Sequence, residues 1–208
     1  MKRIFSVLLV TIMFLSITAS ALGNDEFEVA KTLLNELGIT ENLDYNAEGI
    51  TRAEMIQIMY RMTNGAPIVH GRIDSDNFED VNEEHWAYEY IETFRYSEVI
   101  FGNGDGYFRP DDFITYAEMI TIIVRTLGWR LIVLSRHGSF PYGYLNVADE
   151  RLVTNFKEEY DIHKKVSIEI AIPIIYQALH APTLGLIWWG TRDVYGPSPS
   201  FYERRNLE

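Results

Sequence analysis

The sequence predicts an all-α protein built from three tandem helical repeats, the third of them degenerate. Two stretches carry this prediction, because ITRAEM at residues 50–55 and ITYAEM at residues 114–119 share five of six letters. A third, diverged copy begins at Val166, and its residues 174–176 line up with residues 58–60 of the first copy. Self-similarity of this kind is typical of proteins assembled from one repeated unit.

The N-terminal residues are predicted to be a secretory signal peptide. Two basic residues, Lys2 and Arg3, precede an apolar run at residues 4–17, and small residues at 19–21 supply a cleavage site. The apolar run is shorter than the roughly 20 residues that a bilayer span needs. The expected division is a signal peptide at 1–21, a domain at 22–181 with repeats at about 27–64, 78–128 and 144–181, and an irregular tail at 182–208.

Composition narrows the classes of partner. The formal net charge is −12, with 18 basic and 30 acidic residues, so the chain lacks the basic surface that nucleic acid requires. The absence of cysteine excludes disulfides and a lipid-modified N-terminus. Five histidines are scattered without metal-ligand spacing, so neither a metal nor a cofactor is expected. Thirteen tyrosines and four tryptophans suit both protein cores and sugar faces.

Each repeated stretch is predicted to begin a helix. Thr51 can accept a hydrogen bond from the backbone of Glu54, whose side chain reaches back to the backbone of Thr51, and Thr115 with Glu118 repeats this capping box. Apolar residues at helical spacing follow each cap and predict a buried stripe. The four capping residues are therefore expected to be structural.

Further helices are predicted before the capped ones, at residues 27–37, 85–99 and 152–160. We expect Trp86 to anchor the second of these helices in the core. Pro173 predicts a kink or a later start of the third capped helix. Residues 131–134 suggest a short buried strand or a turn.

A glycine-rich loop occupies residues 101–113. Its Asn and Asp residues invite a calcium interpretation, but an EF-hand count from Asn103 places Tyr107 and Phe108 at the fifth and sixth positions, where an oxygen ligand and a glycine are needed. Turn formation is therefore the better interpretation of this loop.

The second repeat closely resembles an S-layer homology motif. The resemblance is carried by Phe78-Glu79-Asp80-Val81, His85-Trp86-Ala87, Gly104-Asp105-Gly106-Tyr107-Phe108-Arg109-Pro110 and Ile114-Thr115-Tyr116-Ala117-Glu118. It implies that three such motifs form one pseudo-threefold helical domain. It also implies non-covalent anchoring of a bacterial surface protein to a secondary cell-wall polysaccharide, often one that carries pyruvate ketals.

The resemblance associates the arginine of Thr-Arg-Ala-Glu with the anionic group of that polymer, and here only Arg52 carries it. A cation at the first helical position is disfavoured by the helix dipole, so helix stability does not select it. An arriving carboxylate would gain the guanidinium fork and free backbone N–H groups at the helix start. The alternative is that Arg52 pairs with a nearby acid or is solvated. Tyr116 and Ile168 hold the matching positions and carry no charge.

The expected function is cell-wall association at the surface of a bacterium. The predicted partner is an anionic secondary cell-wall polysaccharide such as a pyruvylated one, bound by Arg52, Tyr116, Asp105 and Arg109. The alternative is a degenerate domain that acts as a structural or protein-interaction subunit of the cell envelope. An enzyme is not expected, because the acidic pairs at 83–84 and 111–112 are adjacent in sequence, whereas glycoside hydrolysis needs two carboxylates across a cleft. The mature chain is expected to be exported and not to span the membrane.

Overall fold

The computed structural model describes residues 26–65, 77–102, 104–152, 161–189 and 192–205. The predicted signal peptide and nearly all of the predicted helix at 152–160 lie outside these residues. Within them, no helix combines the length and the apolar character that crossing a membrane requires.

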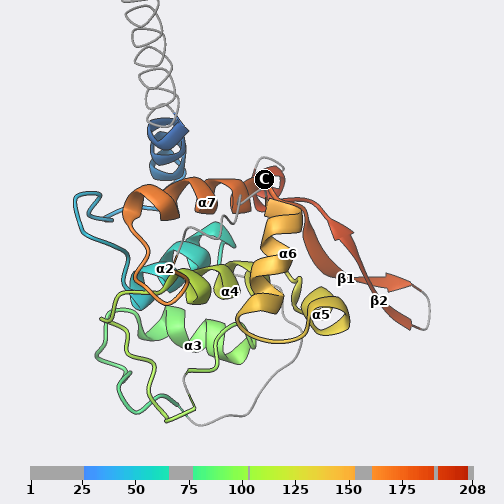
Figure 1. Cartoon of the computed structure of the whole chain (residues 1–208), viewed down its shortest axis with the longest axis horizontal. Helices are drawn as coiled ribbons and strands as arrows, with labels where there is room; N and C mark the ends of the chain where they lie inside the picture. The colour runs from blue at the N-terminus through green and yellow to red at the C-terminus, as the bar shows by residue number, and fades with distance from the viewer. Residues whose placement is uncertain (1–25, 66–76, 103, 153–160, 190–191, 206–208) are drawn as a thin grey trace, which may run out of the picture.

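The fold is mostly helical, as the sequence predicts (Figure 1). An N-terminal helix covers residues 26–36. The remaining helices are α2 (Arg52–Met62), α3 (Tyr88–Tyr96), α4 (Tyr116–Thr126), α5 (Arg130–Ile132), the π-helical turn η1 (Val133–His137), α6 (Tyr142–Leu152), α7 (Ile168–His180) and α8 (Phe201–Arg205). Two strands, β1 (Thr183–Trp189) and β2 (Arg192–Ser198), pair antiparallel. The pseudo-threefold arrangement of three repeats stays a prediction.

Both predicted capping boxes are confirmed. At α2, Glu54 N donates to Thr51 Oγ1 over 3.2 Å and Thr51 N donates to Glu54 Oε2 over 2.7 Å. At α4, Glu118 N donates to Thr115 Oγ1 over 3.3 Å and Thr115 N donates to Glu118 Oε2 over 2.9 Å. Helix α7 differs, because its N-cap residue Ser167 makes no side-chain capping bond.

Backbone hydrogen bonds hold the three helix starts side by side. Ile114 N donates to Ile50 O over 2.9 Å, and Val166 N donates to Ile114 O over 3.0 Å. The approach is close enough that a Cβ atom on Gly49 would lie 2.7 Å from Val166 O. Segments more than a hundred residues apart in sequence therefore meet at one point.

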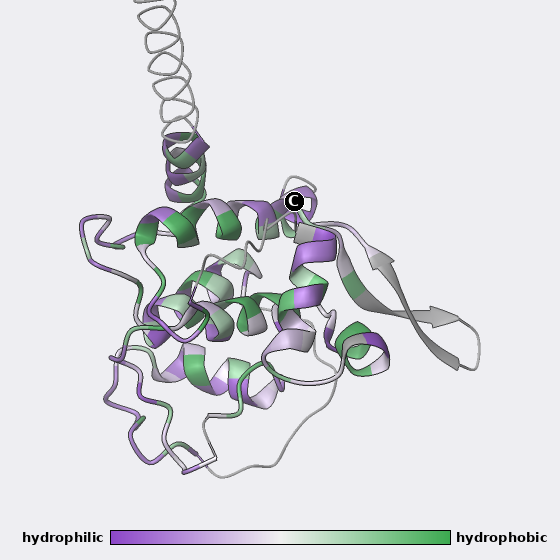
Figure 2. Ribbon diagram, viewed as in Figure 1, coloured by the Kyte–Doolittle hydropathy of each residue, from purple (hydrophilic) through white to green (hydrophobic). Residues whose placement is uncertain are grey.

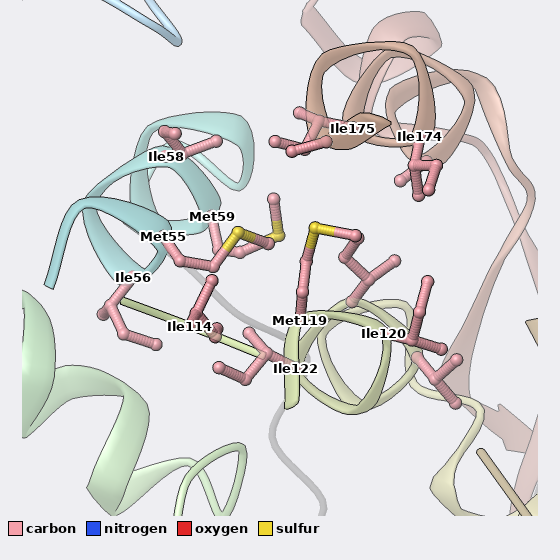
Figure 3. Close-up of a cluster of buried hydrophobic side chains, with 14 of the residues drawn as sticks. Met55, Ile56, Ile58, Met59, Ile114, Met119, Ile120, Ile122, Ile174 and Ile175 are labelled. Atoms are coloured by element: carbon pink, nitrogen blue, oxygen red, sulfur yellow. The ribbon is translucent and has the colours of Figure 1, made fainter. Parts of the chain in front are cut away.

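A central part of the core lies between α2, α4 and α7 (Figure 3). Their apolar side chains point toward one another, and each is at most 7% exposed. The labelled members are Met55, Ile56, Ile58, Met59, Ile114, Met119, Ile120, Ile122, Ile174 and Ile175. Helix α4 is hydrophobic along most of its length in Figure 2, which agrees with its burial on nearly all sides. Burial of each such side chain contributes about 1.5–3 kcal/mol.

The prediction that Trp86 is a core anchor is wrong, because its side chain is 52% exposed. The chain makes turns before α3, with His85 N bonded to Asn82 O and Tyr88 N bonded to His85 O. Helix α3 therefore starts at Tyr88, three residues later than predicted, and Trp86 lies outside its buried stripe.

Two local predictions in the second half of the chain are also corrected. Residues 131–134 belong to α5 and η1, and they form neither a strand nor a simple turn. Helix α7 runs through Pro173, which excludes the later start, and the kink at Pro173 stays a prediction. Proline has no N–H group, so the carbonyl of Glu169, four residues before Pro173, loses its hydrogen-bond donor. Glu169 is an exposed residue in the first turn of α7, so this missing hydrogen bond costs little.

The segment expected to be an irregular tail is structured. Strands β1 and β2 form a hairpin from Thr183 to Ser198, and α8 follows it. The hairpin joins the helical body where Leu184 N donates to Leu127 O over 2.9 Å. Trp129 is 1% exposed, and its indole N–H donates to Pro182 O over 3.1 Å. The domain boundaries themselves stay predictions.

Loss of a capping hydroxyl is expected to destabilise the fold only where that hydroxyl makes a bond. Thr115→Ala is expected to lower the free energy of unfolding by about 1 kcal/mol, because it removes the acceptor for Glu118 N. Ser167→Ala serves as the matched control and is expected to change it little. Chemical denaturation measures both, and equal losses in the two variants would contradict the assignment.

Candidate functional site

A cavity of about 370 Å³ lies beside α4 and the short segment at residues 100–102. Its volume falls in the range of about 300–1,000 Å³ that is typical of small-ligand sites. Its lining combines two guanidinium groups, one carboxylate and two phenyl rings. The lining residues are Arg52, Ile100, Phe101, Gly102, Glu118, Thr121, Ile122, Arg125 and Phe140.

Arg52 forms one wall of this cavity and also links distant segments. Its side chain is nearly buried, with Nε donating to Phe108 O over 2.7 Å and Nη1 donating to Glu118 Oε1 over 2.5 Å. The guanidinium also lies over the Phe108 ring, 4.7 Å from the ring centre. Its third nitrogen, Nη2, makes no hydrogen bond to any residue that the structure describes. Two of the three guanidinium nitrogens, Nε and Nη1, thus donate to the protein, and Nη2 does not do so within the described residues.

The expectation that free backbone N–H groups at this helix start would receive an anion is wrong. Arg52 N donates to Asp112 O and Ala53 N donates to Pro110 O, each over 2.9 Å. The N–H of Glu54, at the third helical position, donates to the hydroxyl of the N-cap residue Thr51. The start of α4 is closed in the same way by the carbonyls of residues 162 and 164. Side chains must therefore supply the contacts to any anionic ligand in this cavity.

Arg125 is the second cation of the cavity and is held without a carboxylate. Its Nε donates to Tyr144 Oη over 3.0 Å and its Nη1 donates to Val99 O over 2.9 Å. Its guanidinium lies 4.8 Å from the centre of the Phe101 ring. Burial lowers the pKa of Arg125 from its ordinary value, but an arginine side chain keeps its charge in proteins. Within the described residues, no acidic side chain forms an ion pair with it.

The charges of the lining do not cancel. Glu118 offsets Arg52, which leaves the charge of Arg125 without a counter-ion among the described residues that line the cavity. Phe101 and Phe140 are 40% and 50% exposed and present apolar rings at the same place. A cation held in place beside exposed aromatic rings suits a ligand with an anionic group on a partly apolar ring.

The glycine-rich loop is positioned by Asp80. Phe108 N and Arg109 N donate to its two carboxylate oxygens over 2.8 Å and 2.6 Å. Because Phe108 O accepts from Arg52, this carboxylate indirectly sets the position of the cavity wall. Asp105 and Arg109 pair with each other on the exposed side of the loop, and the hydrogen bond from Arg109 lowers the pKa of Asp105. No three metal-type ligands come together among the residues described.

The structure brings some of the predicted site residues together and separates others. Arg52 lines the cavity, together with Glu118, which was predicted only as a capping residue. Tyr116 is 3% exposed and packs in the core outside the lining. Asp105 and Arg109 also lie outside the lining. Their roles in carbohydrate binding stay predictions.

Sequence reasoning did not identify Arg125, Phe101 or Phe140. Arg125 stands in the last turn of α4, where basic residues are common for helix stability alone, so its position carries no distinctive signal. Phe140 lies between the second and third predicted repeats, at about 78–128 and 144–181, where no repeat pattern points to it. Only the tertiary fold places these side chains beside Arg52.

Comparison with known families and proteins gives a consistent result. Residues 77–120 match the family described as the S-layer homology domain. The chain is 29% identical over 102 residues to a protein named cell surface protein from Thermoanaerobacter kivui. The matched stretch covers 49% of this chain and 13% of the relative. The chain is also 29% identical over 131 residues to the middle cell wall protein of Brevibacillus brevis, covering 62% and 10% of the two chains.

A third relative is the surface layer protein of Brevibacillus choshinensis, 29% identical over 113 residues, which are 52% of this chain and 10% of the relative. The matches thus cover only 10–13% of the length of these relatives. The family match contains residues 100–102 and Glu118 of the cavity, whereas Arg52, Arg125 and Phe140 lie beyond it.

The role of Asp80 leads to a testable expectation. Asp80→Asn is expected to lower the free energy of unfolding by about 1.5–3 kcal/mol, because an amide offers one acceptor oxygen where the carboxylate serves two N–H groups. Hydrogen exchange at the amides of Phe108 and Arg109 is expected to accelerate. Asp111→Asn, at an exposed carboxylate of the same loop, is the control. Unchanged exchange at both amides in Asp80→Asn would contradict the anchoring role.

Proposed function

This chain carries an S-layer homology domain at residues 77–120, and from that premise we propose that it binds an anionic secondary cell-wall polysaccharide through the cavity beside α4. The predicted location at the cell surface is confirmed by the family match and by relatives that are cell-surface and surface-layer proteins. Association with the cell wall follows from the same comparisons. The nature of the polymer and the residues that bind it are our proposal.

The observation that carries the proposal is the charge of Arg125. A partly buried cation without a counter-ion is unfavourable, and an anionic group that enters the cavity offsets that cost. Arg52 lines the same cavity and has its Nη2 atom available for a second charge-assisted hydrogen bond. Two cations at one cavity of an acidic protein favour an anion as the ligand.

The aromatic residues indicate which kind of anion fits. Phe101 and Phe140 provide apolar surface for the C–H face of a sugar ring. A carboxylate fixed to a sugar ring, as in a pyruvate ketal, joins both features in one ligand. Long-range electrostatics oppose its approach, because the chain carries a net charge of −12. Affinity must therefore come from close contacts inside the cavity.

A second candidate function is a structural or protein-interaction subunit of the cell envelope. The observation in its favour is that Arg52 bonds to Glu118 and to Phe108 O, so its side chain already serves to link α2 to α4. The uncharged residues Tyr116 and Ile168 at the matching helix starts point in the same direction. The two functions differ in whether the protein needs the wall polymer.

Sedimentation with peptidoglycan sacculi separates the two functions. The full-length protein is expected to sediment with sacculi that keep their secondary polymer and to remain in solution with stripped sacculi. Arg52→Gln and Phe140→Ala are expected to weaken binding at least about tenfold, since each removes a contact to the ligand. Arg136→Gln removes an exposed charge outside the cavity and is expected to bind normally.

Phe140→Ala keeps the test valid if Arg52→Gln fails to fold, because Phe140 is half exposed and does not belong to the buried core cluster. Equal sedimentation with stripped sacculi would overturn the proposal in favour of the second function. Normal binding by a folded Phe140→Ala and a folded Arg52→Gln would overturn the assignment to this cavity.

A further inference from the structure

A second basin lies at the start of α3 and has a volume of about 450 Å³. It is lined by residues 83–86 and 88–90 and shares no residue with the cavity beside α4. Its chemistry is the reverse of that cavity, because its charged groups are carboxylates. What it could bind is therefore a separate question from the proposed function.

Trp86 lines the basin and is its most notable aromatic residue, because it is 52% exposed. Its indole is held by other rings, with His85 stacked at 5.8 Å and Tyr90 edge-on at 6.4 Å between ring centres. Tyr60 of α2 supports Tyr90 at 4.9 Å. The His85 ring is fixed in turn, since its Nδ1 accepts a hydrogen bond from Ala87 N over 3.1 Å.

This arrangement gives a positioned aromatic surface that the protein does not cover. A half-exposed indole forgoes part of the favourable burial that a tryptophan normally gains. Because neighbouring rings already restrict Trp86, a ligand that stacks on it meets a surface with little remaining conformational freedom. Sugar rings present C–H faces that suit such a surface.

Three carboxylates surround this surface, those of Glu83, Glu84 and Glu89. All three are exposed, and none forms an ion pair with a residue that the structure describes. The face of an indole also attracts cations through its quadrupole. Acidic groups around an open tryptophan therefore select a ligand that combines an apolar ring face with a positive charge.

We propose that the basin at Trp86 binds an amino sugar whose nitrogen is a free ammonium, such as a glucosamine unit that lacks its acetyl group. The sugar ring stacks on Trp86, and the ammonium lies among the carboxylates of Glu83, Glu84 and Glu89. An N-acetylated sugar keeps the stacking but lacks the charge. An anionic sugar is repelled, so this basin and the cavity beside α4 take different ligands.

Calorimetric titration of the full chain with oligosaccharides tests the proposal. At a pH that keeps the amine charged, a glucosamine tetrasaccharide is expected to bind at least about tenfold more tightly than an N-acetylglucosamine tetrasaccharide. Trp86→Ala is expected to weaken this binding at least about tenfold. The triple variant Glu83→Gln, Glu84→Gln and Glu89→Gln is expected to bind both sugars equally.

Phe140→Ala is the matched control, because it removes an exposed aromatic ring from the other cavity and is expected to leave glucosamine binding unchanged. Absence of glucosamine binding would overturn the proposal. So would equal binding of the two sugars by the unaltered chain, or tighter binding of a tetralysine peptide, which would indicate a basic protein partner. Failure here leaves the sedimentation result with wall polymer unaffected, so the two proposals are tested separately.

Discussion

The contact between the start of α2 and the loop that precedes α4 determines where the candidate site lies. Two backbone N–H groups of α2 donate to the loop carbonyls of Pro110 and Asp112, and the side chain of Arg52 donates to the carbonyl of Phe108. Asp80 holds the same loop from the other side through two further N–H groups. These bonds engage the backbone donors at the start of α2. The guanidinium of Arg52, which is only partly engaged, lines the cavity.

This arrangement explains how an acidic protein could present the proposed site for an anion. The net charge of −12 lies mainly on exposed carboxylates, whereas the cavity contains the partly buried Arg125 and the nearly buried Arg52. Glu118 balances only one of these two cations. Because the interior screens charge less than water does, the proposed close contact of an anion with Arg125 would outweigh distant repulsion. The carboxylates around Trp86 reverse this pattern at a second place on the surface.

Local interactions could be predicted from the sequence, and tertiary ones could not. The capping boxes at Thr51 and Thr115 depend on residues three positions apart, so their pattern is readable in the chain. The position of Arg125 beside Arg52 depends on how α2 packs near α4, which no local pattern encodes. Trp86 was misplaced because turns before α3 remove it from the helical register. The hairpin at residues 183–198 was missed because Gly and Pro interrupt its strands and no alternation marks them.

The most direct test of the account is a crystal structure of the full chain with an acidic fragment of the purified wall polymer. The account predicts that the anionic group of the sugar lies within hydrogen-bond distance of the guanidinium groups of Arg125 and Arg52, with the sugar ring against Phe101 or Phe140. A fragment bound at another surface, with this cavity containing only water, would contradict it.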